Sequence, residues 1–413
     1  MALSMKIMPE IAIIGAGPAG LFAAEQLATA GHRVTVYDRM PSVARKFLLA
    51  GRGGLNLTHI ELLETFISRY GTAALWLEPA IRSFPPSALR AWCESLGQST
   101  FVGSSGRVFP KAMKASPLLR AWLQRLNTLG VRFAMRHSWQ GWHGQALHFI
   151  TDGKDVLVQP TATLLALGGG SWPRMGSDGG WTQYLTEKNI AVAPLRPSNC
   201  GFIVPWSDYF AERFAGQPLK PVAAKTDCGM RQGEIIITRQ GLEGSLIYAM
   251  SAELRDRITQ AGHALLTLDL RPNMSRQQIM QKLATARSGE SLSGKLRRSG
   301  FPPLAAALLR ECLPAEKFQS PNHAELAGWL KALPVRLSEA ASLTRAISSA
   351  GGIKQQEFNE EYMLKALHGV FVAGEMLDWE APTGGYLLQG CFSTGHAAAQ
   401  GMMKWLAGAG KPA

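Results

Sequence analysis

Residues 11–20 read IAIIGAGPAG, and residues 34–38 read VTVYD. The first four residues are apolar and mostly β-branched, which is typical of a buried parallel strand. The glycine spacing GxGxxG that follows allows a tight turn, a close approach of the backbone to a pyrophosphate, and close packing of a helix on the strand. The second strand ends at Asp38, 18 residues after Gly20, where an acid is expected to hydrogen-bond a ribose hydroxyl. Together these features predict a dinucleotide-binding βαβ unit with the phosphates on the helix N-terminus.

The composition is that of an ordinary globular protein. With 413 residues, of which 46% are hydrophobic, the chain can bury a large core, and its length suggests two or three domains. No stretch approaches the roughly 18 to 20 uninterrupted apolar residues of a membrane span. Residues 1–10 carry one positive charge, Lys6, and lead into a strand, so we expect no secretory signal. We therefore expect a cytoplasmic protein without a membrane partner.

The five cysteines show neither CxxC nor CxxxxC spacing. This spacing argues against a zinc site and against a dithiol redox centre, so we expect no metal. Only Cys391 lies in a glycine-rich segment, where both a buried thiol and a thiol facing an active site remain open interpretations.

The net charge of +13 raises the question of an acidic partner such as nucleic acid. The densest basic region runs over residues 271–298, where seven Lys and Arg residues stand against one acid, Glu290. Because no aromatic residues are interleaved with these charges, the region favours a solvated helical face over a base-stacking surface. We therefore do not expect a nucleic-acid partner, and keep RNA association as an alternative.

The pattern of the remaining sequence indicates where the fold is interrupted. Helices are expected over 60–70, 87–96 and 117–129, and an antiparallel meander over 131–160. An apolar strand over 163–167 ends in three glycines. After Pro194 the chain turns to short, proline-punctuated β-like pieces and then, from 252, to a helical and basic region. A buried strand over 369–375 then marks the return to the first domain.

Three further glycine-rich elements fall at predicted strand ends, where ligands of open α/β sheets bind. They are residues 45–59, residues 166–180, and residues 372–391. Glu375 stands where it can accept hydrogen bonds from a polyol chain, and a helix beginning near Gly390 would direct its positive end at developing negative charge. If one cofactor contacts several glycine-rich segments that lie far apart in the sequence, that cofactor is more typically a flavin than a nicotinamide. No second GxGxxG with strand and acid follows, so we expect NAD(P)H, if used, to dock transiently.

These segments resemble the BaiN/YhiN-type family of NAD(P)/FAD-dependent oxidoreductases, which are glutathione-reductase-like flavoproteins. The resemblance extends over nearly the whole chain and is sharpest at 11–20, 46–59, 166–179 and 369–395. The family's GGGRCN loop reads Gly51-Arg52-Gly53-Gly54-Leu55-Asn56 here, within AGRGGLNLTH. The chain therefore resembles a divergent subgroup that lacks the usual cysteine beside the flavin.

The resemblance implies an α/β fold with a discontinuous FAD-binding Rossmann domain and an inserted β-barrel-like and helical domain. The implied borders are 1–193 for the first part of the FAD domain, 194–251 for the β-barrel-like part, 252–320 for the helical part, 321–345 for the return through the insert, and 346–413 for the second part of the FAD domain.

It also implies the residues that bind the cofactor. The diphosphate is expected on Gly15, Ala16, Gly17, Pro18, Ala19 and Gly20, and the adenosine ribose on Asp38 and Arg39. The remaining contacts of FAD are expected from Lys46, Arg52, Gly53, Gly54, Asn56, Gly168, Gly169, Gly374, Glu375, Gly385, Tyr386, Leu387 and Gln389. Tyr386 is the candidate catalytic side chain, because it lies between two glycines and the Gln389 turn.

From these observations we expect an FAD-dependent oxidoreductase that acts on a small organic substrate. The flavin carries the hydride or electron transfer, and the protein orients the substrate and tunes the ring. Two alternatives stay open at this point. One is an RNA-associated flavoprotein, and the other is a non-catalytic flavin-binding redox sensor.

Overall fold

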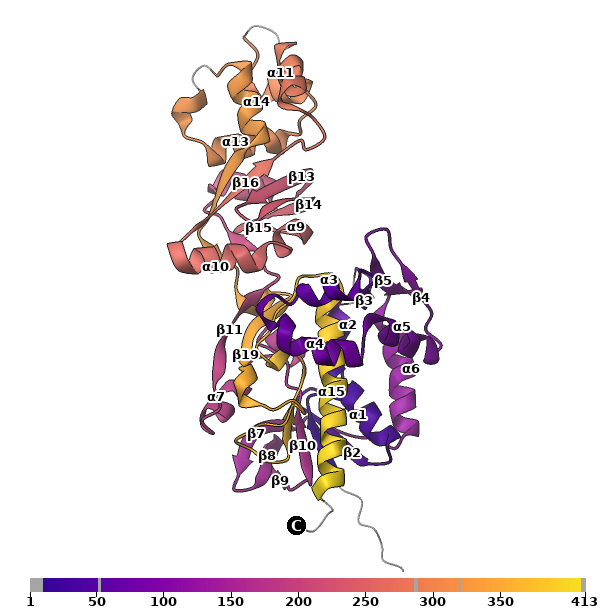
Figure 1. The fold of residues 1–413 in the computed structure, drawn as a ribbon. Helices are drawn as coiled ribbons and strands as arrows, with labels where there is room; N and C mark the ends of the chain where they lie inside the picture. Colours follow the sequence, from indigo (N-terminus) through magenta and orange to yellow (C-terminus); the bar gives the residue numbers. More distant parts are fainter. Residues whose placement is uncertain (1–9, 51–52, 286–288, 319–320, 410–413) are drawn as a thin grey trace, which may run out of the picture. The chain divides into compact units, whose positions relative to one another are not determined.

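The computed structural model describes residues 10–50, 53–285, 289–318 and 321–409 (Figure 1). The chain divides into two compact units. The first unit comprises Met1–Pro197 and Leu343–Ala413, and the inserted unit comprises Ser198–Ser342. The predicted borders lie at 193/194 and 345/346, and the finer division of the insert into two domains remains a prediction.

The first unit is built on a five-stranded parallel sheet in the order β20-β10-β1-β2-β6. Its strands are β1 (Glu10–Ile14), β2 (Arg33–Asp38), β6 (Arg132–Met135), β10 (Ala162–Leu165) and β20 (Val370–Val372). In the register, Ile14 pairs with both Tyr37 and Leu165, and Leu165 pairs with Val372. The carboxyl ends of these strands therefore meet at one edge of the sheet. This sheet confirms the predicted α/β, Rossmann-type fold.

One expectation for this unit is wrong in its pairing. The sequence predicts a single antiparallel meander over 131–160, but β6 pairs in parallel with β2 and extends the main sheet. Only β7 (Ser138–His143), β8 (Ala146–Thr151) and β9 (Lys154–Val158) form an antiparallel sheet. Residues 131–135 read VRFAM, and so short a stretch shows no periodicity that separates parallel from antiparallel pairing.

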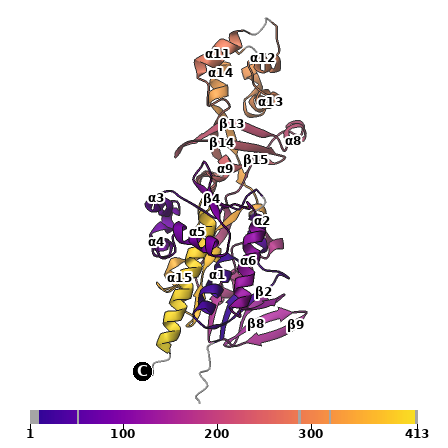
Figure 2. The same cartoon turned by 90° about the vertical axis from the view of Figure 1, so that its right-hand side faces the viewer.

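Two helices dominate the face that carries the glycine turn. Helix α1 (Pro18–Thr29) follows β1, and α15 (Tyr386–Ala409) runs beside it in both views (Figures 1 and 2). A Cβ atom at Gly395 would stand 2.5 Å from the carbonyl oxygen of Ala19, so the two helices approach with backbone against backbone. Helix α15 begins four residues before the predicted start near Gly390. None of the helices among the described residues is long and apolar enough to cross a membrane.

The rest of the first unit consists of short helices and small sheets. The helices are α2 (Arg45–Ala50), α3 (Leu63–Ser68), α4 (Ala74–Ser83), α5 (Pro86–Ser95), α6 (Ala115–Thr128) and α7 (Trp181–Thr186). The small sheets pair β3 (Thr58–His59) and β4 (Thr100–Val102) with β5 (Arg107–Pro110), and β11 (Val192–Ser198) with β19 (Ser348–Ile353).

The inserted unit contains a seven-stranded antiparallel sheet in the order β17-β16-β13-β14-β15-β12-β18. Its strands are β12 (Phe202–Ile203), β13 (Pro218–Thr226), β14 (Gly229–Thr238), β15 (Gly241–Glu243), β16 (Ala264–Asp269), β17 (Leu333–Leu337) and β18 (Glu339–Ala340). Its helices are α8 (Asp208–Phe214), α9 (Ser245–Tyr248), α10 (Ser251–Ala261), α11 (Arg276–Ala284), α12 (Leu292–Arg298), α13 (Pro303–Cys312) and α14 (His323–Lys331).

Candidate functional site

The three glycines of the β1–α1 turn have different physical roles. Gly15 has φ +111°, and a Cβ atom there would stand 2.2 Å from the carbonyl oxygen of Ala166. A Cβ atom at Gly20 would stand 2.0 Å from the carbonyl oxygen of Gly15. These two glycines are therefore required for packing within the protein. A Cβ atom at Gly17, by contrast, would meet nothing within 4 Å, so the space above Gly17 is free for a ligand.

The N-terminus of α1 faces this free space. Gly17 is the N-cap, no side chain caps the helix, and the first turn contains no acid. The amides of Ala19 and Gly20 belong to the first turn and have no acceptor within the helix. Uncapped amides and the positive end of the helix dipole form a binding site for a phosphate.

Asp38 joins this turn to the end of β2. Its carboxylate accepts hydrogen bonds from the amides of Ala16 and Met40, each at 2.8 Å. Burial raises the pKa of Asp38, and the two backbone hydrogen bonds oppose that rise. Each carboxylate oxygen keeps a second lone pair with which it can accept from a ribose hydroxyl.

Two neighbouring cavities share lining residues at the turn, and we call the two together the cofactor channel. The smaller, of about 100 Å³, runs from Asp38 along the N-terminus of α1 to Glu375. The larger, of about 270 Å³, lies beyond Asp38. The residues that line both are Gly15, Asp38, Leu167 and Gly176. A dinucleotide needs such an elongated site, with its diphosphate near the middle.

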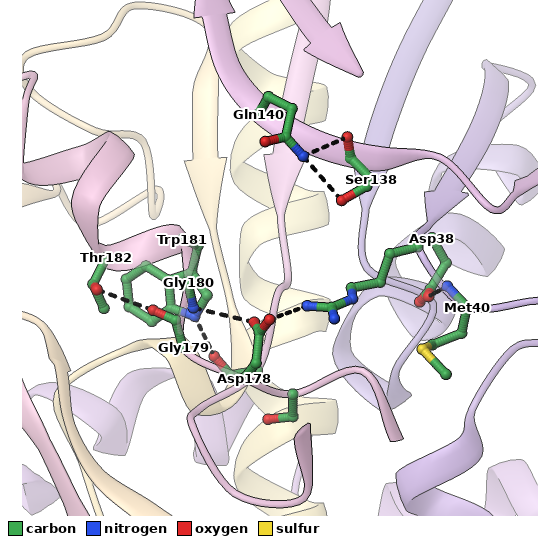
Figure 3. Close-up of polar contacts among 12 residues, drawn as sticks. Asp38, Met40, Ser138, Gln140, Asp178, Gly179, Gly180, Trp181 and Thr182 are labelled. Atoms are coloured by element: carbon green, nitrogen blue, oxygen red, sulfur yellow. Dashed lines mark hydrogen bonds and ion pairs between the residues drawn. The ribbon is translucent and has the colours of Figure 1, made fainter. Parts of the chain in front are cut away.

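Aromatic rings and polar side chains line the larger cavity, and Figure 3 shows the polar contacts of some of these residues. Arg39 forms an ion pair with Asp178, which also accepts from the amide of Gly180 at 3.1 Å. Gln140 donates to Ser138. The rings that line the cavity are those of Tyr37, His137, Trp139, Trp181 and Tyr184. Flat walls with a few oriented polar groups suit the adenine ring of a dinucleotide.

At the other end of the channel, Glu375 joins three segments of the chain. Its carboxylate accepts from Lys46 Nζ at 2.7 Å and from the amides of Ser349 at 3.0 Å and Gly169 at 3.4 Å. Lys46 Nζ also donates to Ser171 Oγ at 2.6 Å. The charged pair is mostly buried, with 25% of the lysine and 13% of the glutamate side chain exposed. Glu375 therefore organises the channel as well as lining it.

Cys391 lines the same end of the channel. Burial raises the pKa of its thiol to about 12, and the nearby Glu375 contributes to the rise. The thiol is therefore protonated at neutral pH and is not a nucleophile.

The glycine-rich loop contains a buried polar atom without a partner. Asn56 Oδ1 is buried and has no hydrogen-bond donor among the described residues. A Cβ atom at Gly53 would meet nothing within 4 Å, whereas one at Gly54 would stand 2.7 Å from Met113 Cε. Because an unsatisfied buried acceptor is costly, the orphaned oxygen indicates that a ligand donates to it. Arg52 lies outside the described residues.

Tyr386 begins α15 and lies in a polar cluster of its own. Its hydroxyl donates to Glu61 Oε1 at 2.5 Å, and Arg69 holds the same carboxylate through two hydrogen bonds of 2.7 and 3.2 Å. The ring of His59 stacks on that of Tyr386 at 5.7 Å. Burial and the hydrogen bond to Glu61 raise the pKa of Tyr386. Burial alone would raise the pKa of Glu61, but the hydrogen bonds from Arg69 and Tyr386 bring it below its ordinary value.

The structure brings together most of the predicted cofactor residues. Those that line the cofactor channel are Gly15, Ala16, Gly17, Pro18, Ala19, Asp38, Arg39, Lys46, Gly168, Gly374 and Glu375. Nine others among the described residues do not line it: Gly20, Gly53, Gly54, Asn56, Gly169, Gly385, Tyr386, Leu387 and Gln389. Gly20 and Gly169 pack against the backbone and against Ser349, and Gly385 packs against the backbone of Thr58. The buried amide of Gln389 bonds to Phe84, Thr58 and Ser393. Leu387 packs against the hydrophobic core.

Sequence reasoning missed one wall of the channel. Gln140, Trp181 and Tyr184 line the larger cavity, yet they belong to segments for which the sequence predicts only a meander and a turn. The aromatic residues of segments 137–142 and 181–184 could have indicated this wall, because each segment follows a strand of the parallel sheet in the chain.

Comparison with known proteins identifies the family. The HI0933-like protein Rossmann domain matches residues 9–401. The chain belongs to the HI0933-like family. This family is the one that the sequence motifs resemble, and it is a family of FAD-dependent oxidoreductases.

Two curated relatives align with nearly the whole chain. A "3-dehydro-bile acid delta(4,6)-reductase" of Clostridium scindens is 22% identical over 405 residues, which are 95% of this chain and 98% of the relative. A "Ribosomal RNA dihydrouridine synthase" of Haemophilus influenzae is 23% identical over 416 residues, which are 96% of this chain and 98% of the relative.

Solved structures agree on the fold. A 3-ketosteroid delta1-dehydrogenase of Sterolibacterium denitrificans superposes with a TM-score of 0.53 at 10% identity, covering 96% of this chain and 99% of its own. An open flavocytochrome c3 fumarate reductase superposes with a TM-score of 0.52 at 13% identity, covering 97% of this chain and 79% of its own.

FAD is the cofactor of this HI0933-like protein, and the channel fits it. The uncapped α1 N-terminus, the open space at Gly17 and the unpartnered Asn56 Oδ1 each offer what a flavin dinucleotide requires. Among the described residues, no group of three or more His, Cys, Asp or Glu side chains is placed to hold a metal ion.

Proposed function

We propose that this protein is an FAD-dependent reductase that adds two hydrogens across a C=C bond conjugated with a carbonyl group in a small organic substrate. The printed names of the relatives support this reaction class. A 3-dehydro-Δ4,6 steroid has its double bonds in conjugation with a ketone, and dihydrouridine is uridine with its carbonyl-conjugated ring double bond saturated. Both names therefore describe the same bond change on unrelated molecules.

In this proposal FAD occupies the cofactor channel through the residues predicted to bind it. Its diphosphate would be held by Gly17 and the uncapped amides of Ala19 and Gly20, its ribose by Asp38, and its adenine by the aromatic residues of the larger cavity. Lys46 and Glu375 face the ribityl end, and Gly53, Gly54 and Asn56 face the ring. Reduced FAD supplies a hydride for the carbon β to the carbonyl. NAD(P)H is proposed as the reductant, docking transiently because no second dinucleotide motif is present.

The observation that carries the reaction class is the protonated phenol of Tyr386 beside an ionised carboxylate. The raised pKa of Tyr386 keeps its proton on the phenol, and the lowered pKa of Glu61 keeps that group ionised. A protonated phenol can deliver a proton to the carbon α to the carbonyl, which completes a reduction.

Tyr386 shares helix α15 with Cys391, which lines the channel. The two residues are five positions apart, which corresponds to about 7.5 Å along the helix axis. We propose that Arg69 and Glu61 position the hydroxyl, and that Arg69, 42% of whose side chain is exposed, connects the cluster to solvent.

The test is an anaerobic half-reaction. The flavin is reduced with NADPH or NADH, a cyclic enone is added, and the return of the absorbance near 450 nm is followed. We expect reoxidation of the flavin with formation of the saturated ketone. Tyr386→Phe should slow this step at least about 100-fold, within the range of general acid catalysis, without loss of bound FAD.

The matched control is Tyr70→Phe. The hydroxyl of Tyr70 donates to the backbone oxygen of Tyr386 at 2.7 Å, so this variant removes a buried hydroxyl from the same cluster without touching the phenol of Tyr386. Equal rates for Tyr386→Phe and wild type would remove Tyr386 from the reaction. A protein whose reduced flavin reacts with oxygen but with no conjugated C=C bond would contradict the proposed reaction class.

A second candidate substrate is uridine in RNA, because two relatives bear the name ribosomal RNA dihydrouridine synthase. The bond change is the same, and the net charge of +13 is compatible with RNA. Digestion of ribosomal RNA from cells with and without the protein separates the candidates. A nucleoside heavier by two hydrogens, present only with the protein, would favour RNA, and an unchanged nucleoside profile would favour the small molecule.

A further inference from the structure

The inserted unit contains a cavity of about 390 Å³ that is separate from the cofactor channel. It lies between α8, α12 and α13, and three of its lining residues are arginines, Arg213, Arg297 and Arg310. All three are exposed. Three guanidinium groups that line one cavity can donate paired hydrogen bonds to an anionic ligand.

These arginines differ from the other basic residues of the region. Arg298 pairs with Glu290, Lys331 pairs with Asp269, and Arg276 donates to the carbonyl of Ala324. The side chains of Arg297 and Arg310, by contrast, have no ion pair or hydrogen bond within the part of the chain that the structure describes. Their guanidinium groups are therefore available to an anionic ligand.

The acid that lines the cavity offsets only part of the charge of the arginines. Among the described lining residues one is acidic, Glu311. Its carboxylate accepts hydrogen bonds from the amide of Ser207 at 2.9 Å and from its hydroxyl at 2.7 Å. Three guanidinium groups and one carboxylate therefore leave the cavity lining with a net positive charge.

An aromatic ring stands beside these charges. Tyr209 is 66% exposed, and its hydroxyl accepts from Arg213 at 2.9 Å. The Arg213 guanidinium lies 5.8 Å from the centre of the Tyr209 ring. No aromatic residue is interleaved with the charges of 271–298 in the sequence, but the fold brings Tyr209 to Arg297 from nearly 90 residues away. The fold therefore places an aromatic ring beside one of these charges, which the sequence pattern does not show.

We infer that this cavity binds the phosphate groups of a nucleotide, with Arg213, Arg297 and Arg310 as phosphate ligands. Guanidinium groups bind phosphate through paired hydrogen bonds. The exposed ring of Tyr209 offers a stacking surface for a base, and the hydroxyl of Ser293 offers a further donor. The inference goes beyond the proposed reductase activity and does not depend on it.

The test measures binding of a fluorescein-labelled single-stranded RNA of twelve nucleotides to the FAD-loaded protein, by fluorescence anisotropy at several salt concentrations. The variants are Arg297→Gln and Arg310→Gln. The matched control is Lys282→Gln on α11, which removes one exposed positive charge outside the cavity. Flavin absorbance and the melting temperature show whether each variant is folded.

We expect each arginine variant to weaken RNA binding about tenfold. The slope of log K against log salt should also fall by about 0.7 for each phosphate that the variant no longer binds. Lys282→Gln should change the affinity less than about twofold. Competition by AMP separates the sources of the nucleotide. If millimolar AMP displaces the RNA, the cavity takes free nucleotides, and if only RNA competes, it takes an RNA strand.

Two results would overturn the inference. One is equal weakening by Lys282→Gln and the arginine variants, which would mean diffuse attraction to a basic surface. The other is the absence of binding to both RNA and AMP at low salt. Neither result bears on the enone half-reaction, so failure here is distinguishable from failure of the proposed reductase function.

Discussion

The substitution Gly17→Val tests the assignment of the α1 N-terminus as the diphosphate site. Gly17 has φ −86° and ψ −178°, an extended conformation that valine adopts freely, and its Cβ position meets no protein atom within 4 Å. The apoprotein should therefore fold as wild type does. The valine methyl groups would fill the space in which the diphosphate approaches the amides of Ala19 and Gly20.

The size of the effect follows from the hydrogen bonds that the diphosphate can no longer accept. A hydrogen bond from a backbone amide to a charged group contributes about 1.5–3 kcal/mol. Removal of two such bonds costs about 3–6 kcal/mol, which corresponds to roughly a hundredfold to ten-thousandfold weaker binding of FAD. Saturation of wild-type protein with FAD at 100 Kd adds about 2.7 kcal/mol of stability, and the variant should not show this gain.

The assay measures FAD content after gel filtration, the Kd of the apoprotein for added FAD, and the unfolding of the apoprotein. The matched control is Gly20→Val, in which Cβ would stand 2.0 Å from the carbonyl oxygen of Gly15. This control should lower the stability of the apoprotein itself, by about 1–3 kcal/mol or more, because the clash is with backbone. The reasoning is refuted if Gly17→Val retains FAD with less than a tenfold change in Kd, or if it destabilises the apoprotein as Gly20→Val does.

Two further predictions concern the other end of the channel. Glu375→Ala should weaken FAD binding and also lower the stability of the apoprotein by up to about 3 kcal/mol, because Lys46 would be left mostly buried without its partner; unchanged denaturant unfolding of the apoprotein would contradict this. With a pKa of about 12, about one Cys391 thiol in ten thousand is ionised at pH 8. Iodoacetamide should therefore label the exposed Cys228 before it labels Cys391. Equal labelling of the two cysteines in peptide mass spectrometry would refute the protonation state assigned to Cys391.

The fold could be predicted because its signals are local. The strand at 11–14, the GxGxxG turn and the acid at the end of the next strand all lie within 28 consecutive residues. The approach of Glu375 to this turn also followed from sequence, since parallel strands end at a common edge of the sheet. The spacing of residues in the sequence could not show that Lys46 lies on helix α2. Nor could it show that its ammonium group contacts the carboxylate of Glu375, which lies 329 residues farther along the chain.

The finer features of the site depend on tertiary contacts that no local pattern encodes. The flanking glycines point to Tyr386, but its partners Glu61 and Arg69 lie more than 300 residues earlier in the chain. The glycine-rich surroundings of Gln389 predict a place beside the flavin ring. In the structure its amide is buried and bonds to the backbone of Phe84 and to the side chains of Thr58 and Ser393, which indicates a structural role. Glycine-rich surroundings do not distinguish contact with a ligand from close packing of backbone.

The measurement that tests the central claim most directly is the visible absorption spectrum of the purified protein, followed anaerobically as NADH and then NADPH is added. The account predicts flavin maxima near roughly 370 and 450 nm that bleach with one of the two donors. A colourless protein that cannot be reconstituted with FAD would contradict the account.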